Sequence, residues 1–313
     1  MHRYGHAARR PSCASLFIPA VRMAAVTTAT LAALLQLAWP SAGADPTFLR
    51  RSIPQIAPHA DGLTAGAAGV SYQPIFGAGD PEAGQLKSVA RYGLLTAATG
   101  GRSAIVSYPA EEQIYYVLDG DGTLAYAGEQ AAMRRHDFAY LPPGVKHGIA
   151  NASSEPLRVL VMGFRIPAGV HVPPTPRLML ANADEVQPVT LAGHGPDCRF
   201  KLLMGTTASR RDKLAAASQM VSLFIMDFTP GGTNIPHHHE MEEEIYYVLR
   251  GQGEMVAGGG ADGHEGRYPA SQGDAYFIRL NATVGFYSGA QRGAEHDLVL
   301  AVRSRFPFPK PEP

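Results

Sequence analysis

Two histidines and one glutamate in the C-terminal third of the chain have the types and spacing of a metal site. His237 and His239 are two residues apart, and Glu244 follows five residues later, at the start of the apolar run Ile245–Leu249. Residues two apart on a β-strand point to the same face, so both imidazoles can face one point. A tight turn before the apolar run would bring the Glu244 carboxylate to them. Two imidazoles and one carboxylate suit Fe(II), Mn(II) or Zn(II) and leave coordination positions open for a substrate.

Two other interpretations of this segment are open. The same loop also contains three further glutamates, Glu240, Glu242 and Glu243. The segment could therefore be a solvated polar hairpin that binds no metal. A different register would use His238, Glu240 and Glu244 as ligands, but it breaks the His-x-His pair. We favour His237, His239 and Glu244, because two histidines and a downstream glutamate at ligand spacing are rare by accident.

The composition favours a protein of two domains built from short strands. Its 313 residues exceed one average domain, and 34 glycines with 25 prolines favour strands joined by turns. The chain has 27 Lys+Arg and 27 Asp+Glu, and residues 1–44 contain four arginines and no acid, so the remainder has a charge near −4. That balance gives no reason to expect nucleic-acid binding. After residue 44 the chain keeps one cysteine, Cys198, so it can form no internal disulfide.

Residues 1–44 have the pattern of a secretory signal peptide. A basic stretch ends at Arg22, an apolar run covers Met23–Trp39, and Ala42-Gly43-Ala44 offers a small-x-small cleavage site before Asp45. A membrane anchor is the alternative, but the apolar run is short for a full span and a good cleavage site follows it. We therefore expect a periplasmic or secreted protein with no stable membrane association after cleavage.

The chain repeats itself. Ile114–Gly122 matches Ile245–Gly253 at seven of nine positions with an offset of 131 residues. Downstream, Leu157–Pro167 parallels Asp297–Pro307. Two copies at this spacing indicate a duplicated domain of roughly a hundred residues rather than a solenoid, which needs shorter periods and more copies. Within each copy, short apolar runs separated by Gly and Pro favour an antiparallel sandwich or barrel.

The landmarks of the two copies follow a pair of motifs. The first is a Gly, five residues, His-x-His, three or four residues, Glu, six residues and Gly, and the C-terminal copy fits it at Gly231, His237, His239, Glu244 and Gly251. The second contains Pro-x-Gly, two residues, His, three residues and Asn, and the N-terminal copy fits it at Pro142, Gly144, His147 and Asn151. With these motifs each copy resembles a cupin, and the chain resembles a bicupin over nearly all of residues 86–306. The resemblance implies an all-β fold of two tandem cupin (jelly-roll) β-barrels with short connecting helices.

This resemblance and the repeat together predict the domain plan. We expect a signal peptide (1–44), an irregular N-terminal arm (45–85), an N-terminal cupin barrel (86–168), a linker (169–198), a C-terminal cupin barrel (199–306) and a tail (307–313). Leu178–Val186 and Asp212–Ala217 are the candidate short helices. The adjacent tyrosines at 115–116 and 246–247 should each place one ring in a barrel interior and one on the opposite face.

The N-terminal copy departs from the first motif at all three metal positions. Val106, Tyr108 and Gln113 stand there, so only His147 of the second motif remains. One imidazole with an amide is a poor divalent site, so we expect this barrel to bind no metal. Tyr108, Gln113 and His147 are instead candidates for lining a polar, metal-free ligand pocket. For His147 itself a structural role at the barrel mouth is the favoured interpretation.

The C-terminal copy departs from the second motif. Arg279, Asn281, Val284 and Ser288 stand at its Pro, Gly, His and Asn positions, so the fourth ligand that cupins usually have is missing. Oxalate decarboxylase-type bicupins keep two full sites, and this chain differs from them in that respect. It is also distantly similar to (S)-ureidoglycine aminohydrolases, but Val284 replaces an amide ligand of those enzymes, and their activity is not carried over.

We therefore expect an exported, metal-dependent enzyme whose C-terminal barrel binds one divalent ion, Mn, Fe or Zn. Its partner should be a small polar metabolite with a carboxylate or hydroxyl group, and the reaction could be that of a dioxygenase, a lyase or decarboxylase, an isomerase or a hydrolase. Tyr287, His296 and Glu243 are the general acid–base candidates. The alternative is a non-catalytic periplasmic small-molecule-binding or structural bicupin, which the damaged motif in each copy supports. A homo-oligomer is compatible with either.

Overall fold

The computed structural model describes residues 47–175, 177–260, 263–290 and 295–308. Strands make up most of the secondary structure in these residues, and the helical elements among them are short 3-10 turns. These turns are η1 (Ile53–Gln55), η2 (Gly62–Thr64), η3 (Ala83–Gln85) and η4 (Ala183–Glu185). In the described part of the chain no helix is long and apolar enough to cross a membrane. The predicted signal peptide, residues 1–44, and most of the predicted tail lie outside the described residues.

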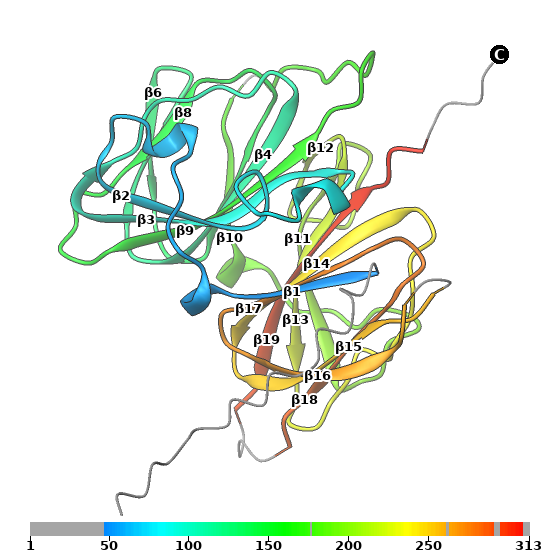
Figure 1. Ribbon diagram of the computed structural model, residues 1–313. Coiled ribbons are helices and arrows are strands. Elements are labelled where there is room, and N and C mark those ends of the chain that lie inside the picture. The colour runs from blue at the N-terminus through cyan, green and yellow to red at the C-terminus, as the bar shows by residue number, and fades with distance from the viewer. Residues whose placement is uncertain (1–46, 176, 261–262, 291–294, 309–313) are drawn as a thin grey trace, which may run out of the picture. The chain divides into compact units, whose positions relative to one another are not determined.

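The N-terminal barrel is one nine-stranded sheet with the order β10-β7-β4-β9-β3-β8-β5-β6, in which β2 also pairs with β3. Every pairing in it is antiparallel. Its strands are β2 (Ala68–Gly77), β3 (Val89–Arg102), β4 (Glu111–Asp119), β5 (Gly122–Tyr126), β6 (Glu129–Met133), β7 (Asp137–Leu141), β8 (His147–Ala150), β9 (Leu157–Arg165) and β10 (Met179–Asn182). Figure 1 shows these strands in blue to green.

The C-terminal barrel consists of a seven-stranded sheet, β1-β17-β14-β19-β13-β11-β12, and a three-stranded sheet, β16-β15-β18. Its strands are β1 (Phe48–Ser52), β11 (Cys198–Thr206), β12 (Leu214–Ala217), β13 (Met220–Phe228), β14 (Glu242–Arg250), β15 (Gln252–Gly258), β16 (Gly266–Ser271), β17 (Asp274–Ile278), β18 (Thr283–Ser288) and β19 (Asp297–Arg305). The curled sheets are those of a jelly roll, so the predicted all-β fold of two tandem barrels is confirmed.

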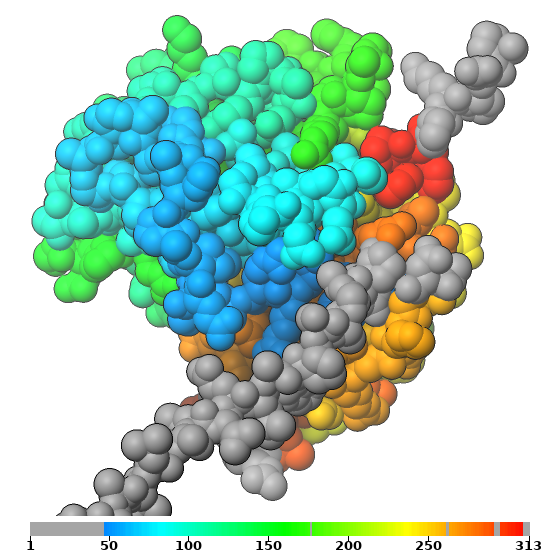
Figure 2. All heavy atoms as spheres, in the orientation of Figure 1, coloured from blue at the N-terminus to red at the C-terminus, as the bar shows by residue number. Residues whose placement is uncertain are grey.

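Each copy of the repeat gives its first strand to the other copy's barrel. β1 precedes the N-terminal barrel but pairs with β17, whereas β10 lies between the barrels and pairs with β7. Phe48 opens β1 and Met179 opens β10, at the 131-residue offset of the repeat. The segments expected as an irregular arm and a linker are therefore equivalent parts of the two copies. In Figure 2 the blue segment after residue 46 lies at the surface, against the teal N-terminal strands and the orange C-terminal strands.

The two short helices predicted for 178–186 and 212–217 are wrong. The first segment contains β10 followed by η4, and the second contains β12. β10 pairs antiparallel with β7, and β12 pairs parallel with β11. Pairing with an existing sheet satisfies the backbone groups of segments that are too short to form stable helices, so tertiary context overrides local propensity.

The adjacent tyrosine pairs divide between two cores, as predicted. Tyr115 lies in the core of the N-terminal barrel and Tyr246 in that of the C-terminal barrel. Tyr116 and Tyr247, one residue on, lie in a third core that contains residues of both barrels. Successive side chains of a strand face opposite sides of a sheet, so one tyrosine of each pair faces inward and the other faces the second barrel.

Two buried carboxylates connect the barrels reciprocally. Glu112 of β4 accepts hydrogen bonds from three successive backbone N–H groups, 218–220 of the C-terminal copy, at 2.7–2.8 Å. Glu243 of β14, 131 residues later, accepts from the backbone N–H groups of Lys87 and Ser88 at 2.8–3.2 Å and from the Ser88 hydroxyl at 2.6 Å. Both glutamates are almost completely buried, so each depends on donors from the other copy to replace water.

Candidate metal centre

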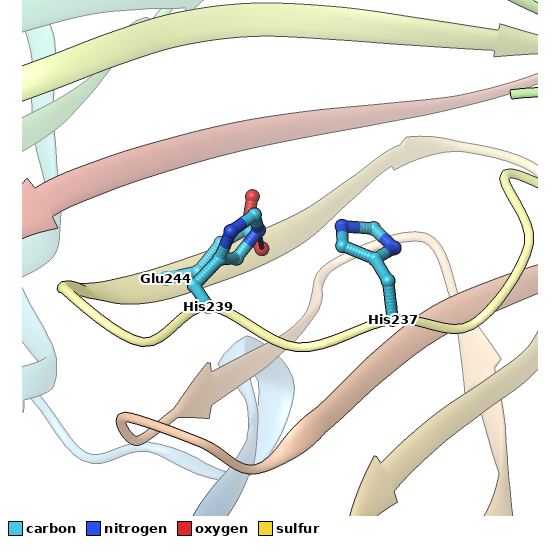
Figure 3. Close-up of side chains that lie close together, drawn as sticks. All are labelled: His237, His239 and Glu244. Carbon is cyan, nitrogen blue, oxygen red and sulfur yellow. Dashed lines mark ion pairs between the residues drawn. The ribbon is translucent and has the colours of Figure 1, made fainter. Parts of the chain in front are cut away.

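The predicted ligands His237, His239 and Glu244 lie together in the C-terminal barrel. Each offers a ligand atom, and these atoms all lie within 4.8 Å of one another. The two imidazoles come from the extended segment before β14 and Glu244 from the beginning of that strand, and Figure 3 shows both rings on the same side of the segment. Backbone hydrogen bonds fix this segment, because His237 exchanges two with Val284, at 3.0 and 2.8 Å, and the His239 carbonyl accepts one from Asn281 at 2.8 Å.

The protonation pattern of the cluster fits a cation. Nδ1 of His237 lies 2.9 Å from the Ile235 carbonyl, which can only accept, so Nδ1 has the proton and Nε2 has a free lone pair. Nε2 of His239 and Oε2 of Glu244 lie 3.2 Å apart, yet each is buried without a hydrogen-bond partner. Two acceptors that face each other without a proton between them would repel in the absence of a positive ion. Burial also lowers the pKa of His237, which favours the neutral form that binds metals.

The alternative register is not supported. The side chain of His238 is 58% exposed, and its nearest acidic partner is Glu240, at 3.9 Å on the surface. Its ring points away from Glu244 because neighbouring residues of an extended segment face opposite sides.

The cluster lines a cavity of about 110 Å³ inside the barrel. Ser222, Arg303 and Glu244 form a row across its floor, since Arg303 of β19 is the cross-strand neighbour of both Ser222 on β13 and Glu244 on β14. Nη1 of Arg303 donates to Glu242 at 3.3 Å, but its Nε is buried without a partner, and so is the Ser222 hydroxyl. The cavity therefore combines a potential metal ligand set with two donors that have nothing to bind within the described residues.

None of the three predicted acid–base residues lines this cavity. The Tyr287 ring lies under the Arg267 guanidinium, 4.1 Å from its carbon, on the outer face of β18. His296 pairs its Nδ1 with Asp227 at 2.6 Å, and its side chain is 40% exposed. Glu243 faces the N-terminal copy, because it precedes the inward-facing Glu244 on the same strand. We correct the expectation that these groups approach the metal position.

The three predicted ligand-binding residues of the N-terminal barrel do lie near one another. His147 and Gln113 are buried, and the Tyr108 and His147 ring centroids are 5.8 Å apart. Nε2 of His147 and Oε1 of Gln113 have no hydrogen-bond partner. Burial lowers the pKa of His147 to about 4, so the ring is neutral at physiological pH. A role for these three in ligand binding stays a prediction.

Sequence reasoning missed three groups of the C-terminal cavity: Arg303, Ser222 and His194. A signal existed for the first two, because each is a polar residue at an inward position of an otherwise apolar strand. His194 belongs to the Pro- and Gly-rich segment before β11, and nothing in its local sequence indicates where that segment leads.

Comparison with known proteins agrees with this geometry. The cupin domain family matches residues 93–163 and again 224–286, one match in each barrel. The chain contains two cupin domains. A curated relative, an uncharacterized protein of Methanocaldococcus jannaschii, is 29% identical over 65 residues, which are 21% of this chain and 52% of that protein. The cupin chain thus spans about half the length of that relative.

Solved structures resemble both cupin barrels together. A putative glyoxylate-induced protein from Pseudomonas aeruginosa has a TM-score of 0.64 at 17% identity, over 85% of this chain and 91% of its own. The protein Ylba from E. coli has 0.63 at 18%, over 85% and 94%. An oxalate decarboxylase from Lactobacillus farciminis, in complex with formate, has 0.62 at 12%, over 83% and 87%. At these identities the likeness establishes the bicupin fold alone.

Proposed function

We propose that this protein is an exported, metal-dependent enzyme that acts on a small carboxylate- or hydroxyl-bearing metabolite in its C-terminal barrel. The observation behind the proposal is one cavity that contains both the cluster His237, His239 and Glu244 and the unpaired donors of Arg303 and Ser222. A divalent ion held by the three ligands supplies Lewis-acid polarisation of a substrate oxygen. Manganese, iron and zinc all suit this ligand set.

Arg303 indicates the chemistry of the substrate. Its guanidinium stays charged, and one of its donors already pairs with Glu242, which leaves Nε for an incoming group. A carboxylate there would gain a charge-assisted hydrogen bond in a site shielded from water. Arg303 neighbours Glu244 across the sheet, so the same substrate would lie beside the metal ligands and could also reach the ion.

Cavity size limits the substrate further. A volume of about 110 Å³ is well below the roughly 300–1,000 Å³ of sites for drug-sized ligands. The substrate is therefore a metabolite of few heavy atoms, and Ser222 offers its hydroxyl to a second polar group. The residues determine no single reaction among dioxygenation, decarboxylation or other lyase chemistry, isomerisation and hydrolysis.

Calorimetric titration of the metal-loaded protein with formate, glycolate, oxalate and malonate tests the proposal. Arg303→Gln should weaken binding of the best carboxylate about tenfold or more, because a hydrogen bond to a charged group contributes about 1.5–3 kcal/mol. Arg267→Gln is the matched control, since Arg267 is exposed on the outer face, and should leave both metal and carboxylate affinity unchanged.

Two results would overturn the proposal. Equal carboxylate binding by the wild type and Arg303→Gln would remove Arg303 from substrate recognition. A wild-type protein that binds none of Mn(II), Fe(II) and Zn(II) at saturation would exclude the metal-dependent enzyme and leave the non-catalytic binding or structural bicupin in its place.

A further inference from the structure

A third imidazole lies next to the cluster, although it comes from outside the C-terminal cupin motif. His194 belongs to the segment before β11, and its ring centroid is 5.4 Å from that of His237. The rings of His237 and His239 are separated by a similar 4.9 Å. All three rings line the same cavity as Glu244.

The His194 ring presents a lone pair rather than a proton on its Nε2. Its Nδ1 is 2.6 Å from the backbone carbonyl of Asn234, and a carbonyl oxygen only accepts, so Nδ1 has the proton. His237 is oriented in the same way by the carbonyl of Ile235. A ring N–H donated to a backbone carbonyl is the usual second contact of a metal-binding histidine, because it fixes both the tautomer and the direction of the other nitrogen.

The partner that orients His194 is rigid. Asn234 is fully buried, and its side chain donates to the Tyr246 hydroxyl at 2.8 Å and accepts from the backbone N–H of Phe286 at 2.8 Å. On its other side, the His194 ring packs against Phe200 with 4.8 Å between ring centroids. The ring is thus held between β11 and the histidine segment, so little side-chain entropy remains to be lost when it binds an ion.

The position that would otherwise supply a fourth ligand cannot do so. Val284 is apolar and completely buried, and it contributes only backbone hydrogen bonds to His237. We propose that His194 supplies the fourth protein ligand, so that three imidazoles and one carboxylate hold the ion. This inference rests on the proposed metal site and adds one consequence. Four protein ligands close a tetrahedral shell, so substrate access requires an ion of higher coordination number, which favours Mn(II) or Fe(II) over Zn(II).

Metal affinity and the spectrum of Co(II) test the inference without any assay of activity. His194→Gln should weaken Co(II) and Mn(II) binding, measured by competition with a chelator, by at least about tenfold, since even outer contacts of metal ligands contribute 10–100-fold. It should also change the visible absorption bands of the Co(II) protein. His238→Gln is the matched control, because His238 is an exposed neighbour of the cluster, and it should change neither property.

A measurement on the wild type avoids the question of whether the variant folds. X-ray absorption of the Co(II)-loaded protein counts the bound imidazoles, and three support His194 as a ligand. Two imidazoles, or equal affinity and equal spectra for the wild type and a folded His194→Gln, would overturn this inference and leave the site of His237, His239 and Glu244 intact. A wild type that binds no metal would instead overturn the proposed function itself.

Discussion

Lowering the pH from 7.5 to 4.5 should destabilise the N-terminal barrel through one buried imidazole. His147 is 1% exposed, and its Nδ1–H donates to the Val145 carbonyl at 3.0 Å. The rings of Tyr108 and Tyr115 pack against it with centroids 5.8 and 5.4 Å away. Burial among these groups lowers the pKa of His147 from 6.5 to about 4. The folded protein therefore resists a proton that the unfolded chain accepts readily.

The sign and size of the effect follow from this difference. The contribution of neutral His147 to stability is complete above pH 6.5 and is lost as the pH falls from 6.5 towards 4. Each pKa unit corresponds to about 1.36 kcal/mol, so the complete loss is about 3 kcal/mol. At pH 4.5 most of it, about 2.5 kcal/mol, should already be lost.

Urea denaturation at pH 7.5, 6.0 and 4.5, with a chelator present throughout, measures this loss. The free energy of unfolding of the wild type should fall by about 2.5 kcal/mol more than that of His147→Gln between the two extremes. His171→Gln is the control, because His171 is exposed, and it should keep the wild-type pH dependence. The reasoning is refuted if all three proteins lose the same free energy over this range.

Three further predictions concern the other parts of the molecule. Glu112→Ala or Glu243→Ala should each lower the free energy of unfolding by about 3 kcal/mol, since buried backbone donors lose their acceptor, while bound metal is unchanged; lost metal with normal stability would contradict the anchoring role of Glu243. His237→Ala combined with His239→Ala should abolish the single bound ion, whereas His147→Ala should leave it, and elemental analysis giving the reverse would assign the metal to the other barrel. Mass spectrometry of exported protein should find cleavage after Ala44, and a retained Met1 would disprove the signal peptide.

Periodicity explains why the metal ligands could be predicted. His237 and His239 share a face because an extended chain alternates its side chains, and Glu244 joins them across a short turn. The same alternation predicted that Tyr115 and Tyr116 face opposite sides. These inferences depend only on residues close in sequence, where backbone geometry limits the positions that side chains can take.

Alternation could also have prevented one error. Glu243 adjoins Glu244 on one strand, so the two carboxylates must face opposite sides, and only one can reach the metal position. What the Glu243 carboxylate does instead depends on the backbone of Ser88, which is 155 residues away, and on the contact between the two copies.

The sequence by itself determined the duplication, the barrel class and the three ligands, because each is encoded in short-range spacing. Only the tertiary structure decided that β1 and β10 exchange barrels, that Arg303 lies beside Glu244, and that His194 reaches His237. These contacts join residues that are distant along the chain. The path of the connecting segments determines them, and that path is settled by which sheet edge can satisfy the free backbone groups and bury the apolar face.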